Sequence, residues 1–174
     1  MQKTRSESLF ERFLQTNGIS FVPVPVEQRR TPDYCVYFDT QEIVFEVKEI
    51  VGERAWGSEV VHSGVVGDAI RAKINDSRGQ IRSAAQQGKP AVLLIFNNYD
   101  PQQLFGTENH DFEHAMLGAD TLLIDKKSGK IIDRFHGQGK ALQVEKNTSF
   151  SALGRLLDGR EEVKVTLFEN IHAK

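Results

Sequence analysis

Three charged residues interrupt two segments that otherwise have the composition of β-strands. Asp33 precedes the first segment, and Glu46 and Lys48 lie within the second, in the stretch TPDYCVYFDTQEIVFEVKEI. Carboxylate oxygens bind hard divalent cations such as Mg²⁺, and an ammonium group can offset charge that develops on a phosphate. Whether the three side chains can act together depends on how the two segments pair.

The two segments are expected to pair as an antiparallel hairpin. If Thr40 and Gln41 form its turn, Asp33 lies opposite Lys48. Alternation then places a purely apolar set on one face, as a half-buried ribbon requires: Tyr34, Val36, Phe38, Ile43, Phe45 and Val47. The other face gathers Asp33, Glu46 and Lys48, with the last two roughly 6–7 Å apart along the strand.

This polar cluster has the composition of a site for a divalent cation. Asp33, Glu46 and the main-chain carbonyl of Val47 would supply oxygen ligands, which Mg²⁺ and Mn²⁺ prefer. The ammonium of Lys48 would lie beside an attacking water and a scissile phosphate, while the metal lowers the pKa of that water. The cluster therefore predicts hydrolysis of phosphodiester bonds.

The quoted stretch resembles the motif of the PD-(D/E)XK nuclease superfamily. Pro32 and Asp33 match its PD, and Glu46, Val47 and Lys48 match its ExK. The resemblance implies a restriction-endonuclease-like fold, Mg²⁺ or Mn²⁺ as the cofactor, and nucleic acid, in the first place DNA, as the substrate. Because the superfamily includes inert members, a binding module on the same fold is the first alternative.

Two further site residues are implied by the same resemblance. Many members carry a glutamate on the first helix, and ESLFERFLQTNG offers Glu7, with Glu11 as the second choice. Members also often place a glutamine or lysine on the helix after ExK, which points to Gln80. The approach of that helix to GKPAVLLIF resembles small nucleases related to archaeal Holliday-junction resolvases.

The expected elements follow the order of that superfamily's core. Apolar periodicity and turn residues predict a helix at 6–15, strands at 19–26, 34–38 and 43–48, a helix at 68–87 and a strand at 91–96. Ser6 is the expected cap of the first helix. Pro23 and Pro25 confine their strand to an edge, and the order strand, helix, strand favours a parallel crossover.

A C-terminal extension is expected to follow this core. The core spans about 6–97, and the extension over 98–174 is predicted to hold a hairpin at 121–125 and 131–135, a short helix at 150–157 and a strand at 163–168. The whole chain is interpreted as one α/β domain with a mixed sheet.

Length, charge and cysteine content limit the class of protein. The 174 residues suit one domain with a sizeable core, and Cys35, the single cysteine, cannot form an intramolecular disulfide. The first residues lack the apolar stretch of a signal peptide, and the longest apolar run, AVLLIF, is too short to span a bilayer. We therefore expect a cytoplasmic protein without a membrane role, and both monomer and homodimer remain open.

A nucleic-acid partner would need a local basic surface, because the net charge is −2. Arg71, Arg78 and Arg82 share one face of the predicted helix at 68–87, with Lys73 and Gln80 to the side. Phosphate contacts are the functional interpretation of this stripe, and an ordinary solvated face is the alternative.

The long glycine-containing segment 51–67 is expected to be a mobile loop beside the site. Arg54, Trp56 and His62 could contact substrate there, with Trp56 stacking on an unpaired base. Simple packing of Trp56 onto the core is the alternative.

A second alternative is a metalloenzyme that does not act on nucleic acid. His110 and His114 are four residues apart, so they can share a helix face as metal ligands. No third ligand is specified by the spacing. Cys35 falls on the face of Glu46, but no base is assigned to it, so no nucleophilic role is expected.

Overall fold

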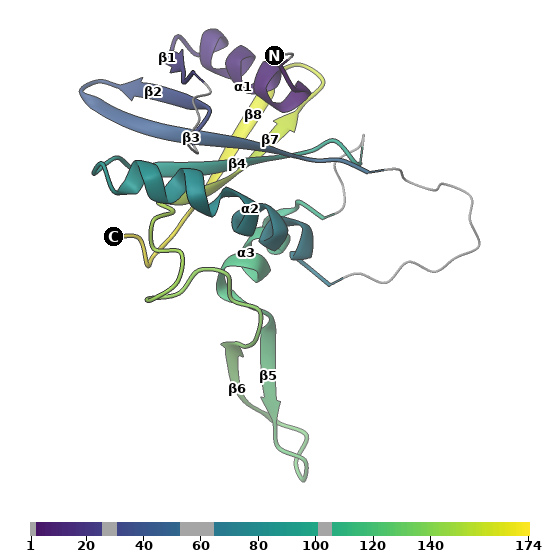
Figure 1. Cartoon of the computed structure of the whole chain (residues 1–174). Coiled ribbons are helices and arrows are strands. Elements are labelled where there is room, and N and C mark those ends of the chain that lie inside the picture. The colour runs from purple at the N-terminus through teal and green to yellow at the C-terminus, as the bar shows by residue number, and fades with distance from the viewer. Residues whose placement is uncertain (1–2, 26–30, 53–64, 101–105) are drawn as a thin grey trace.

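The computed structural model describes residues 3–25, 31–52, 65–100 and 106–174. These residues form a mixed α/β structure with three helices, a six-stranded sheet and a separate two-stranded sheet (Figure 1). The helices are α1 (Arg5–Thr16), α2 (Asp68–Ala85) and α3 (Asn109–Leu117). None of them is long and apolar enough to cross a membrane.

The large sheet has the strand order β1-β2-β3-β4-β7-β8. Its strands are β1 (Ser20–Pro23), β2 (Tyr34–Phe38), β3 (Gln41–Ile50), β4 (Ala91–Asn97), β7 (Ala152–Asp158) and β8 (Val163–Glu169). β1, β2 and β3 form an antiparallel meander, β4 runs parallel to β3 and to β7, and β8 returns antiparallel to β7. The expected edge position of the proline-containing strand and the parallel crossover through α2 are both confirmed.

Helices cover both faces of the sheet. Leu9, Phe10 and Leu14 of α1 pack on one face, where they meet Phe45 and Val47 of β3. The other face packs against buried side chains of α2 and α3: Ile70, Ile74, Ile81, Ala84, Phe112, Ala115 and Met116. Figure 1 shows α1 on one side of the sheet and α2 with α3 on the other. Because side chains alternate along a strand, Glu46 and Lys48 lie on the α2 side.

The first helix begins one residue earlier than expected and has a different cap. Thr4 is the N-cap: its hydroxyl accepts from the N–H of Glu7 at 3.2 Å, and its own N–H donates to Oε2 of Glu7 at 2.6 Å. This reciprocal pair is a capping box, which satisfies two of the N–H groups left open at a helix start. Ser6, the predicted cap, is buried inside the first turn instead.

The turn between β2 and β3 differs from the expected one by one residue. Asp39 and Thr40 form it, with Asp39 in the left-handed region at φ 51°. An aspartate tolerates that conformation and so permits a tight two-residue turn. Tyr34 therefore pairs with Phe45, and continuing this register places Asp33 opposite Glu46, not Lys48. A slip of two residues leaves every side chain on its predicted face.

The helix predicted at 150–157 is wrong, because this segment is strand β7. It lies between β4 and β8 and pairs with both. Leu153 packs into the core on the α2 side and Leu156 into the core on the α1 side, so the strand is buried on both faces and lacks the alternation of a half-exposed strand. Gly154 is tightly enclosed: a Cβ there would lie 2.2 Å from Cδ2 of Leu94 and 2.9 Å from Cδ2 of Leu167. A glycine inside a strand often marks such a close approach.

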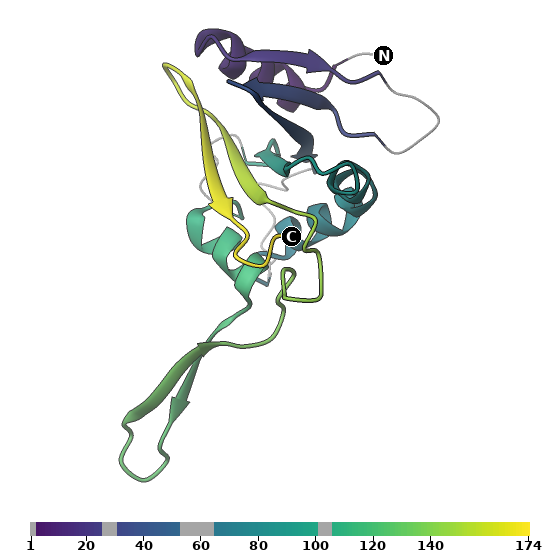
Figure 2. The same ribbon diagram turned by 90° about the vertical axis from the view of Figure 1, so that its left-hand side faces the viewer.

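The predicted hairpin of the C-terminal extension is confirmed as β5 (Asp120–Ile124) and β6 (Ile131–His136). It forms the two-stranded sheet and extends away from the rest of the molecule in both views (Figure 1, Figure 2). The last predicted strand is confirmed as β8.

Candidate active site

Asp33 lies where β2 and β3 stop pairing. Its N–H donates to the carbonyl of Phe45 at 3.0 Å, and its Oδ2 accepts from the N–H of Val47 at 2.8 Å. A side-chain oxygen thus takes the place of a main-chain acceptor from β2. The hydrogen bond holds the carboxylate of Asp33 against β3 at Val47, which lies between Glu46 and Lys48.

Glu46 is a buried acid with only one of its two oxygens paired. Its side chain is 1% exposed, and its Oε1 lies 2.5 Å from Nζ of Lys48, whose side chain is 28% exposed. Oε2 is buried and has no hydrogen-bond partner among the residues that the structure describes. A buried carboxylate oxygen without a donor is unfavourable, so the lysine alone does not satisfy this group.

The pKa values of the cluster show that its acids lie in a poorly solvated place. Burial raises the pKa of Glu46 to about 7, and the charge of Asp33 adds to the rise although Lys48 opposes it. Burial also raises the pKa of Asp33, against the hydrogen bond from Val47. For Lys48, burial lowers the pKa, but the neighbouring carboxylates outweigh burial and the net change is upward. Such a cluster favours uptake of a cation.

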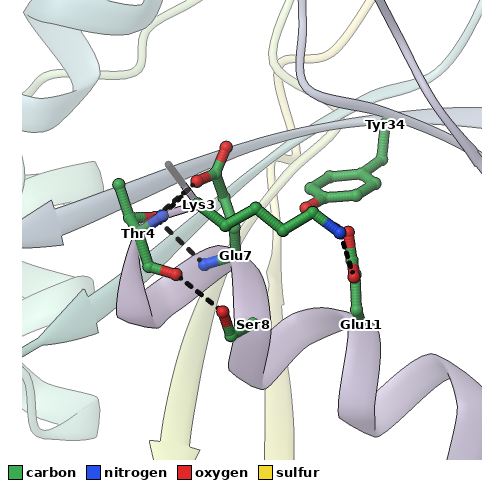
Figure 3. A network of polar contacts seen from close by, with 6 residues as sticks. All are labelled: Lys3, Thr4, Glu7, Ser8, Glu11 and Tyr34. Atoms are coloured by element: carbon green, nitrogen blue, oxygen red, sulfur yellow. Dashed lines mark hydrogen bonds and ion pairs between the residues drawn. The ribbon is translucent and has the colours of Figure 1, made fainter. Parts of the chain in front are cut away.

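Glu7 contributes negative charge from the α1 side of the sheet. Its carboxylate raises the pKa of both Asp33 and Glu46. Oε2 of Glu7 belongs to the capping box with Thr4, and its Oε1 makes no hydrogen bond within the described part of the chain (Figure 3). Glu7 therefore reaches the cluster through its charge while its position is fixed by the start of the helix.

Glu11, the second choice on α1, is used elsewhere. Its Oε1 accepts from the hydroxyl of Tyr34 at 3.0 Å, and its Oε2 binds Nζ of Lys3 at 2.7 Å (Figure 3). These contacts tie α1 to β2. Glu7 remains the better candidate on this helix.

One flank of α2 faces the cluster. The charge of Asp76 raises the pKa of Lys48, so Asp76 is close enough to interact with it. Lys73 and Gln80 lie three residues before and four residues after Asp76, and hence on the same flank. Oε1 of Gln80 is buried without a donor among the described residues. Asp76 was not among the predicted site residues, although its spacing from Lys73 and Gln80 places it on their flank.

The predicted arginine stripe lies on the opposite flank of α2. Arg78 and Arg82 are separated from Lys73 and Gln80 by the buried stripe that contains Ile74. With about 100° of rotation per residue, the two arginines fall on the far side of that stripe from the cluster. They therefore do not lie next to Asp33, Glu46 and Lys48.

Arg71 is engaged within the fold. Its guanidinium donates to Oδ1 of Asp68 at 2.7 and 3.0 Å, to the carbonyl of Val66 at 2.6 Å and to the carbonyl of His114 at 3.3 Å. These bonds join the start of α2 to the end of α3. A phosphate would have to compete with these four hydrogen bonds. Arg71 is therefore not part of the proposed nucleic-acid interface.

Arg54, Trp56 and His62 lie outside the described residues. The expected substrate contacts of this segment therefore remain predictions.

The histidine alternative gains no support from geometry. Nδ1 of His110 lies 3.3 Å from Glu108, and the carbonyl of His114 accepts from Arg71. Across residues 3–25, 31–52, 65–100 and 106–174, no group of three or more His, Cys, Asp or Glu side chains could hold a metal ion. A cation at Asp33 and Glu46 would therefore need further ligands such as the Val47 carbonyl, water and substrate oxygens.

Cys35 is a weakly acidic thiol. Burial and a hydrogen bond to Glu42 raise its pKa to about 11, so it stays protonated near neutral pH and is a poor nucleophile. Glu42 is also bound to Lys89 at 2.7 Å. This agrees with the absence of an assigned catalytic role.

The described cluster unites the buried Glu46, the partly buried Asp33 and a lysine at the point where two strands separate. No protein-family model, curated protein or solved structure matches the chain. The function therefore has to be inferred from the chemistry of the site.

Proposed function

We propose that the chain is a Mg²⁺- or Mn²⁺-dependent nuclease of the PD-(D/E)XK type that hydrolyses phosphodiester bonds, with DNA as the first substrate to test. The observation that carries this proposal is the buried Glu46, which has one oxygen on Lys48, one oxygen without a donor, and Asp33 opposite. The order helix, three strands, helix, strand over α1 to β4 supports a restriction-endonuclease-like core.

The donor groups fit a hard divalent cation. The unpaired Oε2 of Glu46, the second oxygen of Asp33 and the carbonyl of Val47 are all oxygen ligands. Burial raises the pKa of both acids, so their ionised forms are poorly solvated and a bound cation would stabilise them. When bound, the ion would lower the pKa of an attacking water.

The chain's own residues would then orient the reacting groups. Lys48, which is partly exposed, would direct ammonium donors at the phosphate and offset charge that develops in the transition state. Gln80, whose Oε1 lacks a donor, would accept a hydrogen bond from water at the site. Glu7 would add negative charge from the other side of the sheet.

The direct test is cleavage of single- and double-stranded DNA and RNA with Mg²⁺, Mn²⁺ or EDTA. Metal-dependent cleavage by the parent, absent in the double variant Asp33→Asn/Glu46→Gln, would support the proposal. If the parent cuts none of these substrates with either metal but binds one of them, the inert binding module becomes the better assignment.

Lys73 is expected to contact a substrate phosphate, because it lies on the flank of α2 that faces the cluster. Lys73→Ala should weaken oligonucleotide binding and reduce the slope of log affinity against log salt by about one. Fluorescence anisotropy in EDTA over a series of NaCl concentrations measures both quantities without cleavage. Lys164→Ala, on the edge strand β8, serves as the control, and an unchanged slope in Lys73→Ala would assign this lysine to solvent.

A further inference from the structure

A polar hollow lies on the flank of α2 that faces away from the Asp33, Glu46 and Lys48 cluster. Its volume is about 160 Å³, and α2 and the chain before β7 line it: Arg78, Arg82, Glu145, Asn147, Thr148, Ser149 and Phe150. The cluster lies toward β2 and β3, whereas this hollow lies toward β7. The two sites are therefore separated by the width of a helix.

Among the described residues, no side-chain acceptor binds the two arginines of the hollow. Nε of Arg78 is buried and has no hydrogen-bond partner within the described residues. Neither Arg78 nor Arg82 forms an ion pair with another described residue. Glu145 lines the same hollow but is not paired with either arginine. Arg82 is exposed, so its free donors are solvated, but a buried donor such as Nε of Arg78 is normally satisfied by an acceptor. The hollow beside Nε of Arg78 therefore has room for an anion from outside the chain.

Two residues with hydroxyl groups line the same hollow, in a segment that is held in place. Thr148 and Ser149 line it, and their hydroxyls make no hydrogen bond among the described residues. The segment itself is anchored: Asn170 Nδ2 donates to the carbonyl of Phe150 at 2.7 Å, and Asn147 Nδ2 donates to the carbonyl of Ala141 at 2.7 Å. The backbone that carries Thr148 and Ser149 is thus fixed on both sides.

We propose that this hollow binds a phosphate group. Two guanidinium groups and two hydroxyls offer several donors around a small volume, and phosphate has enough acceptor oxygens to use them. The phosphate could belong to a nucleic-acid backbone or to a small phosphate-bearing molecule. The first source rests on the proposed nuclease function, and there the hollow would hold a phosphate away from the scissile one.

The test follows the Nε–Hε signals of arginines by ¹⁵N nuclear magnetic resonance, with the full chain in EDTA. Arg78→Lys and Arg82→Lys assign the two signals while keeping the charge. Inorganic phosphate should shift both signals to saturation, whereas the signals of Arg12 and Arg134, which are bound to Asp158 and Asp120, should not move. Thr148→Val and Ser149→Ala should each weaken phosphate binding by about two- to tenfold.

A short oligonucleotide without a terminal phosphate separates the two sources. If it shifts the Arg78 and Arg82 signals, the backbone is the ligand. If inorganic phosphate shifts them and the oligonucleotide does not, the phosphate site stands with a small-molecule ligand. If neither shifts them, or if chloride shifts them equally, the hollow is no phosphate site. Because no cleavage is measured, failure here is distinct from failure of the nuclease assignment.

Discussion

Lys48→Met should lower the rate of metal-dependent cleavage by about a hundredfold to a thousandfold, which is the usual effect of removing one positioned donor to transition-state charge. The same substitution should leave the affinity for Mn²⁺ equal to that of the parent or higher. The reason is that Lys48 now occupies Oε1 of Glu46 at 2.5 Å, and its loss both frees that oxygen and removes a positive charge near the metal. Single-turnover cleavage and Mn²⁺ calorimetry on the same variant measure the two effects.

Matched variants distinguish this role from simple charge balance. Asp33→Asn and Glu46→Gln should each weaken Mn²⁺ binding and cleavage together, because each removes an anionic oxygen ligand. Lys89→Met removes the lysine of another lysine–glutamate pair, with Glu42, and should leave cleavage unchanged. A Lys48→Met protein that cuts at the parent rate would refute the catalytic assignment of this lysine.

Alternation along two short strands was sufficient to predict which side chains gather around Glu46. The predicted register was wrong by two residues, because the left-handed conformation of Asp39 is a property of one turn residue and leaves no periodic signal. The grouping nevertheless survived, since a slip of two preserves both faces. At Asp33 β2 separates from β3, which lets the side chain of Asp33 accept a hydrogen bond from the N–H of Val47. The alternation of apolar and polar residues does not predict this separation.

The strand β7 was not predictable from local pattern. Its sequence reads as a helix because a strand buried on both faces shows no alternation, and its identity depends on pairing with β4 and β8 far away in the chain. Helical spacing likewise predicted that Arg78 and Arg82 share a face. It did not predict on which side of α2 the cluster lies, because that depends on how the helix packs across the sheet.

The second large effect concerns the stability of the metal-free protein. Glu46→Gln should become more stable relative to the parent as pH rises from 5 to 8, by about 2–3 kcal/mol. The pKa of Glu46 is about 7 in the folded protein, against 4.5 for a glutamate in water, so the folded parent binds this proton more tightly than the unfolded chain does. Parent stability from this group is therefore present at low pH and is lost as pH rises through the window from about 4.5 to 7.

Urea unfolding in EDTA at pH 5 and pH 8 measures this difference for parent and variant. Glu42→Gln on the same strand is the matched control. The hydrogen bond from Lys89 lowers the pKa of Glu42, so the ionised Glu42 already stabilises the fold at pH 5. Glu42→Gln should therefore change the free energy of unfolding equally at pH 5 and pH 8. Mn²⁺ should restore stability to the parent at pH 8 and much less to Glu46→Gln, because a ligand stabilises only the folded state that binds it. If Glu46→Gln shows no gain between pH 5 and pH 8, Glu46 is a compensated salt-bridge partner of Lys48, and the unpaired Oε2 no longer supports a cation site.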